Sequence, residues 1–306
     1  MSTTNTRYKK INTVSALANF SLIAFFTVVC LLCIIPMLIV LSSSFTPDTT
    51  IVLKGYTIIP ENPVITAYAF IFSDEGKVIR AYVIQILTTV IGTILSVLIT
   101  SMIAYPLSRK ELPHRNFFAF FVFFTMLFSG GLAPTYYVYT RILDLKNTFF
   151  ILFIPYLVGG FNVIILRTFF TSNVSSEIIE SAKIDGSGEF RTFFKVVFPI
   201  SLPGIATIAL FTTVGLWNDW YLSMLYIDNE KLTNLQYLMY KTLLSIQYIK
   251  ANESFRSAYG NDILAKLPVE STRMAMAMIG MGPILIAYPF FQKFFIKGLT
   301  IGAVKG

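Results

Sequence analysis

The stretch SSEIIESAKIDGSGEFRTFFKVVFPISLP, from Ser175 to Pro203, predicts two short helices joined by a tight turn. Ser175 or Ser176 can cap the first helix, and Glu177 in its first turn suits the helix dipole. The run Asp185-Gly186-Ser187-Gly188 ends that helix, because glycine tolerates backbone angles that other residues resist. The second helix has an apolar face made of Phe190, Phe193, Phe194, Val197 and Phe198. Such a pair of helices forms a compact knob, a shape that can dock into a groove.

The segments on both sides of this knob are strongly apolar. Of the 306 residues, 55% are hydrophobic and 13% are charged, whereas soluble domains carry about a quarter charged residues. Aromatic residues make up 15% of the chain, which excludes an intrinsically disordered protein. The composition therefore predicts a membrane protein.

Six runs without Asp, Glu, Lys or Arg are long enough to span a bilayer core, which needs about 20 apolar residues. The runs cover residues 11–47, 81–108, 116–140, 147–166, 196–218 and 274–292. In the first run we expect the membrane part to be about 14–41, with a kink at Pro36. The sequence thus predicts an all-α membrane protein with six transmembrane helices.

The distribution of Lys and Arg predicts the orientation of these spans. With the N-terminus inside, the inner segments are 1–10, 109–115, 167–195 and 293–306, and they hold 13 of the 24 basic and five of the 16 acidic residues. The whole net charge of +8 therefore lies on one face. Both termini are expected to be cytoplasmic, and the positive charge requires no nucleic-acid partner.

The outer loops differ in length. Residues 48–80 contain Gly55, Pro60 and Pro63, which favour turns and extended chain. The segment 219–273 is longer than a simple connector and contains apolar residues with helical spacing between Leu235 and Ile246. This pattern predicts an amphipathic helix that lies on the outer membrane face or against a partner.

No constellation of residues in the chain predicts catalysis or metal binding. Cys30 and Cys33 lie in one apolar run and are interpreted as core residues, and His114 stands alone in a polar link. A phosphate-binding loop is absent from the sequence, and Gly186-Ser187-Gly188 lacks the preceding strand and third glycine of a dinucleotide site. We therefore expect that the chain is not an enzyme and binds no cofactor itself.

The knob resembles the EAA loop of bacterial ABC importer permeases. The matching residues are Glu180-Ser181-Ala182, then Asp185-Gly186, then Pro199 and Leu202-Pro203, and Ser181 replaces the usual first Ala. Leu216-Trp217-Asn218-Asp219-Trp220 is similar to the Trp-Asn element of carbohydrate permeases of the maltose-transporter type. The segment Lys297–Gly306 resembles that family's tail, and Ser129–Tyr136 is similar to an oligosaccharide-uptake branch common in Gram-positive bacteria. The resemblance covers about residues 80–306.

This resemblance implies a permease subunit in a bacterial plasma membrane. Its protein partners would be a second related permease, two ATPase subunits that bind ATP and magnesium, and an extracellular solute-binding lipoprotein. It would also contact membrane lipid, and it would take up a carbohydrate by alternating access. The implied domains are a cytoplasmic segment 1–13, a first helix with its outer loop 14–80, a permease core 81–295 and a cytoplasmic tail 296–306. The core would contain the coupling loop 167–198 and the outer loop 219–273.

The resemblance also implies two groups of site residues. Residues that couple to the ATPase would be Glu180, Ser181, Ala182, Asp185, Gly186, Gly302, Lys305 and Gly306. Residues on the substrate pathway would be Tyr136, Trp217, Asn218, Asp219 and Trp220. Polar and aromatic residues are also expected at a membrane boundary without any substrate role. The alternative function is a secondary transporter of a polar solute, although the first four spans contain no carboxylate for a coupling ion.

Overall fold

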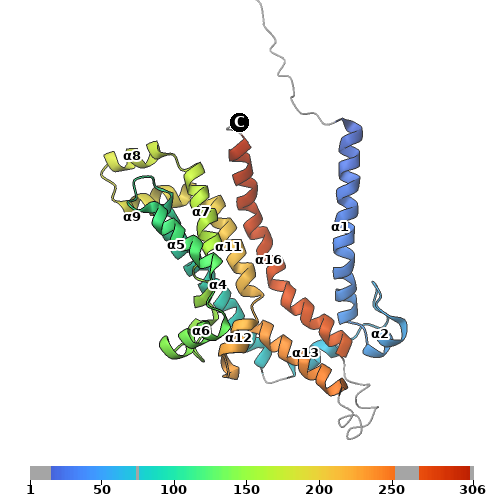
Figure 1. Cartoon of the computed structure of the whole chain (residues 1–306). Helices are drawn as coiled ribbons and strands as arrows, with labels where there is room; N and C mark the ends of the chain where they lie inside the picture. The colour runs from blue at the N-terminus through green and yellow to red at the C-terminus, as the bar shows by residue number, and fades with distance from the viewer. Residues whose placement is uncertain (1–14, 74–75, 252–268, 304–306) are drawn as a thin grey trace, which may run out of the picture. The chain divides into compact units, whose positions relative to one another are not determined.

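The computed structural model describes residues 15–73, 76–251 and 269–303 (Figure 1). Within these ranges all regular structure is helical and no strand occurs. The prediction of an all-α protein is therefore confirmed. The chain divides into two compact units, one with residues up to Phe70 and 261–278, and one with 71–260 and 279–306.

The first unit contains α1 (Ala16–Ser44), α2 (Asp48–Lys54), most of α3 (Thr66–Phe72) and the start of α16 (Val269–Ala303). Most side chains of α1 are exposed, as expected for a helix whose surroundings are lipid. The expectation of turns and extended chain after this helix is only partly right, because α2 and α3 lie there.

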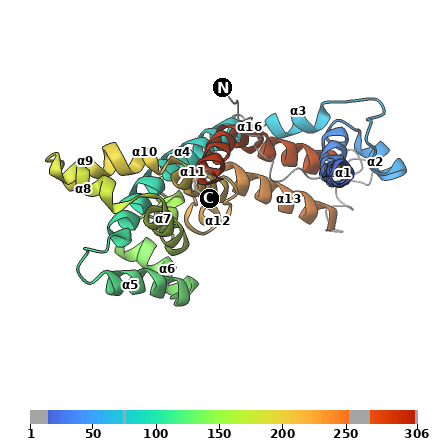
Figure 2. The same cartoon turned by 90° about the horizontal axis from the view of Figure 1, so that it is seen from above.

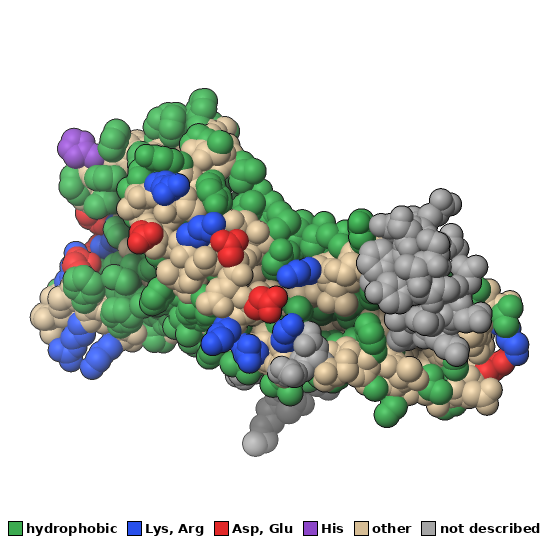
Figure 3. Space-filling model, turned by 90° about the horizontal axis from the view of Figure 1, so that it is seen from below, with side chains coloured by type: hydrophobic (Ala, Val, Ile, Leu, Met, Phe, Trp, Pro, Cys, Tyr) green, Lys and Arg blue, Asp and Glu red, His purple; other side chains and the backbone are tan. Residues whose placement is uncertain are grey.

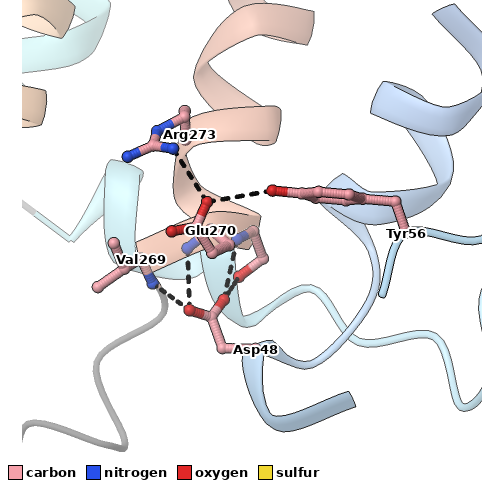
Figure 4. A network of polar contacts seen from close by, with 6 residues as sticks. Asp48, Tyr56, Val269, Glu270 and Arg273 are labelled. Atoms are coloured by element: carbon pink, nitrogen blue, oxygen red, sulfur yellow. Dashed lines mark hydrogen bonds and ion pairs between the residues drawn. The ribbon is translucent and has the colours of Figure 1, made fainter. Parts of the chain in front are cut away.

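Within this unit, Asp48 at the start of α2 caps the start of α16 (Figure 4). Its carboxylate accepts hydrogen bonds from the backbone N–H groups of Glu270 and Ser271, both at 2.9 Å, and from Val269 N–H and the Ser271 hydroxyl. A negative group is favourable there because the first N–H groups of a helix lack helical partners. Beside this cap, the Glu270 carboxylate accepts from Arg273 at 3.1 Å and from Tyr56 at 3.3 Å.

The second unit is built around three helices, α4 (Lys77–Ser108), α7 (Gly160–Asn173) and α11 (Leu202–Trp217), which pack on one another. Gly92 permits a close approach, since a Cβ there would lie 2.7 Å from Leu216 and 2.8 Å from Phe153. Polar side chains join α4 to α11: Gln85 Nε2 donates to Leu216 O at 2.8 Å. These contacts hold α4 and α11 close together.

Three of the predicted spans are bent in the structure. The bent pairs are α5 (Arg115–Leu127) with Leu132–Ile142 at 110°, Phe150–Tyr156 with α7 at 51°, and Glu189–Ile200 with α11 at 83°. Glycine or proline stands at each break: Gly130-Gly131, Gly159-Gly160 and Pro203. The helix of the fourth predicted span, 147–166, accordingly starts only at Gly160 and continues to Asn173.

By length and hydropathy, α1 and α4 can each cross a membrane alone, and the three bent pairs would raise the number to five among the residues described. The predicted sixth span, 274–292, lies within α16. The count of six and the cytoplasmic termini stay predictions. Residues 296–303 of the predicted tail 296–306 continue α16, and residues 304–306 lie outside the described residues.

The predicted domain bounds stay predictions, while the helices of the structure begin and end at other residues. Helix α4 already begins at Lys77, and residues 261–278, predicted as part of the core, belong to the first unit. The predicted loop 219–273 and the predicted last span overlap in one helix, because α16 begins at Val269. The start of this helix belongs to the first unit, where the Asp48 carboxylate of α2 accepts hydrogen bonds from its backbone N–H groups.

Candidate coupling site and transport pathway

The predicted knob is formed by α8 (Ser176–Ile184) and α9 (Glu189–Thr192), which lie side by side (Figure 2). Helix α8 ends in a Schellman turn: Gly186 N–H donates to Lys183 O at 3.0 Å, and Ser187 N–H donates to Ala182 O at 2.9 Å. Gly186 has φ +76°, a left-handed angle that favours glycine. The predicted glycine turn is confirmed.

The second helix of the knob differs from the prediction. After α9 the chain forms a π-helical turn, η4 (Phe193–Val197), and only then a short helix α10 (Phe198–Ile200). A π turn shifts the helical register, so the predicted single apolar face is divided. Phe193 and Val197 are buried, whereas Phe190 and Phe194 are exposed.

The knob is fixed to the end of α4 by polar and aromatic contacts. Lys183 Nζ pairs with Glu189 Oε1 at 2.8 Å across the turn, and Tyr105 OH of α4 donates to Glu189 Oε2 at 3.4 Å. The rings of Tyr105 and Phe193 lie 5.3 Å apart. The Lys183 ammonium holds the pKa of the Glu189 carboxyl below its usual value, which keeps the ion pair charged at neutral pH. A force on the knob therefore reaches α4 through several contacts at once.

The predicted coupling residues do not all face outward. Glu180, Ser181, Asp185 and Gly186 are exposed, but Ala182 is only 9% exposed and packs within the chain. The Ala182 side chain is thus largely covered by this chain, and little of it is left for a partner to contact. Helix α7 also extends to Asn173, so the predicted loop 167–198 begins at Val174.

The remaining coupling residues belong to the C-terminal end. Gly302 lies in the last turn of α16, whereas Lys305 and Gly306 lie outside the described residues.

Two of the predicted pathway residues are engaged inside the protein. Trp217 is buried, and its indole N–H donates to Gly280 O at 2.7 Å. Asp219 accepts from Tyr156 OH at 2.8 Å and from Leu222 N–H at 3.0 Å. Both residues therefore position helices.

The other three predicted pathway residues are distributed over different surfaces. Tyr136 stacks on Tyr226 with ring centroids 5.4 Å apart, and Trp220 stacks on Tyr240 at 4.4 Å. Asn218 is exposed, and its amide donates to Val214 O at 2.9 Å. The structure does not bring the five predicted residues together into one site.

The predicted amphipathic helix is present as α13 (Leu235–Ala251). Its apolar residues Leu235, Leu238 and Met239 pack in a cluster with Trp217 and Ile279 of the same unit. The expectation that this face meets the outer membrane surface or a partner is therefore wrong for its first turns. The cause is a tertiary contact that periodicity alone does not show.

The sequence analysis did not identify the polar residues that join the segment before Phe150 to the segment after α12. Asn147 Oδ1 accepts from the backbone N–H groups of Asp228 and Asn229 at 2.6 and 3.1 Å, and Lys146 pairs with Asp228 at 2.8 Å. Asn234 Nδ2 donates to Asp219 O at 2.6 Å. Asn147 has φ +59°, and the enrichment of Asn at such angles was the one local signal for this role. Figure 3 shows the face that carries α6 (Leu132–Tyr137), α12 (Tyr221–Tyr226) and α13, where basic and acidic side chains are mixed.

Comparisons with known proteins match most of the chain. A family model described as "Binding-protein-dependent transport system inner membrane component" matches residues 115–301. The polygalacturonan/rhamnogalacturonan transport system permease protein YtcP of Bacillus subtilis (strain 168) is 37% identical over 90% of this chain and 94% of that protein. Protein LplC of the same organism is 36% identical over 89% and 90%, respectively. A solved bacterial ABC transporter involved in the import of the acidic polysaccharide alginate matches with a TM-score of 0.76 and 26% identity, over 93% of this chain and 99% of that one.

Proposed function

The chain belongs to the family of binding-protein-dependent transport system inner membrane components, and from this membership we propose that it forms one half of the translocation path of an ATP-driven oligosaccharide importer. Its relatives are permease components of ABC importers for sugars and oligosaccharides, and ATP is hydrolysed on separate ATPase subunits of such systems. The chain is thus a membrane permease and not an enzyme.

The observation that carries this proposal is the attachment of the exposed knob to α4. A subunit that binds ATP can move the permease only if it holds a rigid part of it. The Schellman turn, the Lys183–Glu189 pair and the Tyr105–Phe193 contact make α8 and α9 such a part. Movement of the knob then moves α4, and with it α7 and α11, between inward-open and outward-open packings.

The proposed contact with the ATPase uses the exposed surface of α8. Glu180 can accept a charge-assisted hydrogen bond from an Arg or Lys of the partner. Ser181 is small and exposed beside it, and Ile184 is 87% exposed, so an apolar anchor accompanies the charge. Asp185 and Gly186 shape the turn, Ala182 packs α8 onto the chain, and Gly302, Lys305 and Gly306 would reach the ATPase subunits from the C-terminus.

The proposed assembly contains a second related permease, two ATPase subunits with ATP and magnesium, and an extracellular solute-binding lipoprotein. The proposed topology has six spans in a bacterial plasma membrane, provided by α1, α4, the first two bent pairs, α11 and α16, with both termini in the cytoplasm. Tyr136, Asn218 and Trp220 are proposed to contact the carbohydrate on its path, while Trp217 and Asp219 position α11 and α12.

Uptake by cells that lack this chain tests the proposal. We expect a deletion strain to lose the import of labelled oligosaccharides from a pectin digest, and the restored gene to recover it. A variant with Glu180→Ala should insert into the membrane normally but restore uptake only weakly. Full uptake in the deletion strain, for every carbohydrate of the digest that the wild type imports, would contradict the proposed function.

A further inference from the structure

A cavity of about 510 Å³ lies at the end of α4, between the link to α5 and the knob. Its volume is in the range of small-molecule sites. Charged side chains of the link and the knob line one part of the cavity, and apolar side chains, among them Met102, Leu112 and Phe190, line the other. A ligand that fills the whole cavity therefore needs a charged part and an apolar part.

Arg109, which lines this cavity, has hydrogen-bond donors without partners. Its side chain is 13% exposed, and its Nε donates to Glu111 Oε2 at 3.1 Å. An arginine has five N–H donors, and those on Nη1 and Nη2 have no hydrogen bond within the described part of the chain. A largely covered guanidinium with free donors favours a ligand anion, and its planar fork matches the oxygens of a phosphate.

The two carboxylates at the cavity do not cancel this preference, because each of them already has a cation. Glu189 pairs with Lys183 at 2.8 Å. Glu111 pairs with Arg109 through Nε alone. The link 109–115 holds three basic residues and one acidic residue, which gives it a net charge of +2. The charge around the cavity therefore favours an anion.

An exposed apolar face of α4 leads into the apolar part of the cavity. The exposed side chains of Leu87, Ile91, Ile94 and Met102 recur at helical spacing, and Arg109 follows at the end of this face. On a helix that crosses a bilayer, such a face offers a track for an acyl chain. Met102 precedes Arg109 by about 10 Å along the helix. In the proposed topology the apolar part of the cavity thus lies deeper in the membrane than the charged part.

The second helix of the knob also places the cavity at the membrane boundary. The segment Glu189–Ile200 makes an angle of 83° with α11. Because α11 is proposed to cross the membrane, this segment lies along the membrane surface. Its exposed side chains alternate between aromatic and basic: Phe190, Arg191, Phe194 and Lys195. Aromatic and basic residues of this kind are typical of the boundary between lipid and water.

We propose that this cavity binds an anionic phospholipid of the inner leaflet, whose phosphate lies on the Arg109 guanidinium and whose acyl chain follows Met102 and the exposed face of α4. Basic pockets between membrane helices on the cytoplasmic side bind lipid head groups in this way. A soluble anion would leave the apolar part of the cavity unfilled. The lipid bridges the end of α4 and the knob, so it strengthens the attachment through which the knob moves α4. This inference rests on the proposed function and topology.

The test uses the complete complex in phosphatidylcholine nanodiscs that contain a small fraction of photoactivatable phosphatidylglycerol. We expect adducts at the apolar residues of the cavity, mapped by mass spectrometry. Arg109→Gln should reduce these adducts at least about tenfold, the size expected for the loss of a charged hydrogen bond. Phe190→Ser should also reduce them, without a change in charge. Because Phe190 is 72% exposed, its replacement should leave the fold intact.

The matched control is Lys110→Gln, which removes the same charge from the neighbouring residue, exposed and outside the lining of this cavity. It should change the labelling by less than about threefold, because salt screens an exposed charge. Equal losses in Arg109→Gln and Lys110→Gln would overturn the site, since they would show a diffuse attraction to the surface.

Two other results would also overturn the lipid site. Displacement of the probe by soluble glycerol phosphate would mean that the cavity recognises a free phosphate group. Adducts that avoid the cavity in the wild-type complex would mean that a partner subunit covers it. Loss of ATP-dependent oligosaccharide uptake by the wild-type complex in proteoliposomes, with the lipid adducts intact, would instead overturn the proposed function.

Discussion

Replacing Gly186 by alanine disfavours one backbone angle in the turn of the knob, and it thereby tests whether this turn is needed for coupling to the ATPase. Gly186 has φ +76°, and a Cβ built there meets no atom within 4 Å. The whole cost therefore comes from the left-handed backbone, about 1–2 kcal/mol for a residue with a side chain. This corresponds to a factor of about 5 to 30 in the population of the native turn relative to its alternatives. Valine should cost more, because a β-branched residue resists this angle more strongly.

Gly188 supplies a matched control in the same turn. Its φ is −72°, and a Cβ there also meets no atom within 4 Å. Both substitutions add one methyl group without a clash, and only Gly186→Ala places it on a left-handed backbone angle. In nanodiscs with the partner subunits, Gly186→Ala should weaken ATPase docking and lower the ATPase rate stimulated by the binding protein, while Gly188→Ala should match wild type. The same activity in both variants would refute the argument that the left-handed turn shapes the docking surface.

Three further predictions concern other parts of the chain. Asp48→Ala should destabilise the first unit by about 0.5–2 kcal/mol, as for the loss of a helix cap. Asp48→Asn should destabilise it less. Equal thermal stability of wild type and Asp48→Ala would contradict the role of Asp48 as a cap. The Lys183–Glu189 pair should add about 0.2–1 kcal/mol because both side chains are largely exposed. Since the pKa of Glu189 is lowered by folding, this gain should be present above the unfolded pKa of about 4.3 and disappear as the pH falls through the folded value. A stability difference between wild type and Lys183→Gln that does not shrink as the pH is lowered below about 4.3 would exclude it. With Cys30 and Cys33 replaced by Ala, a thiol probe should label Ile184→Cys only from the cytoplasm and Lys231→Cys only from outside. The reverse labelling pattern would show that the chain has the opposite orientation in the membrane.

The elements that the sequence predicted well are those with a strong local signal. Asp185-Gly186-Ser187-Gly188 ended α8 because the left-handed angle at Gly186 is a local property of the backbone. The apolar periodicity between Leu235 and Ile246 also predicted a helix correctly. The family resemblance through Glu180, Gly186 and Leu202-Pro203 was confirmed by the family match.

The elements that the sequence did not predict depend on contacts between distant residues. An apolar run shows that a segment can lie in the membrane, but not that Gly130-Gly131 bends it by 110°. The polar residues Asp219 and Trp217 looked available for a substrate, whereas Tyr156 and Gly280, remote in sequence, engage them.

The most direct measurement of the central claim is the energy source of uptake in proteoliposomes that contain the complete complex and the binding protein. The account predicts that oligosaccharide enters only when ATP and magnesium are supplied on the side of the ATPase subunits. It also predicts that Gly186→Val abolishes this uptake while the complex still binds sugar through its binding protein. Uptake that is driven by an ion gradient without ATP would contradict this account. Unchanged uptake in Gly186→Val would contradict the assignment of the knob as the part that converts ATP hydrolysis into movement.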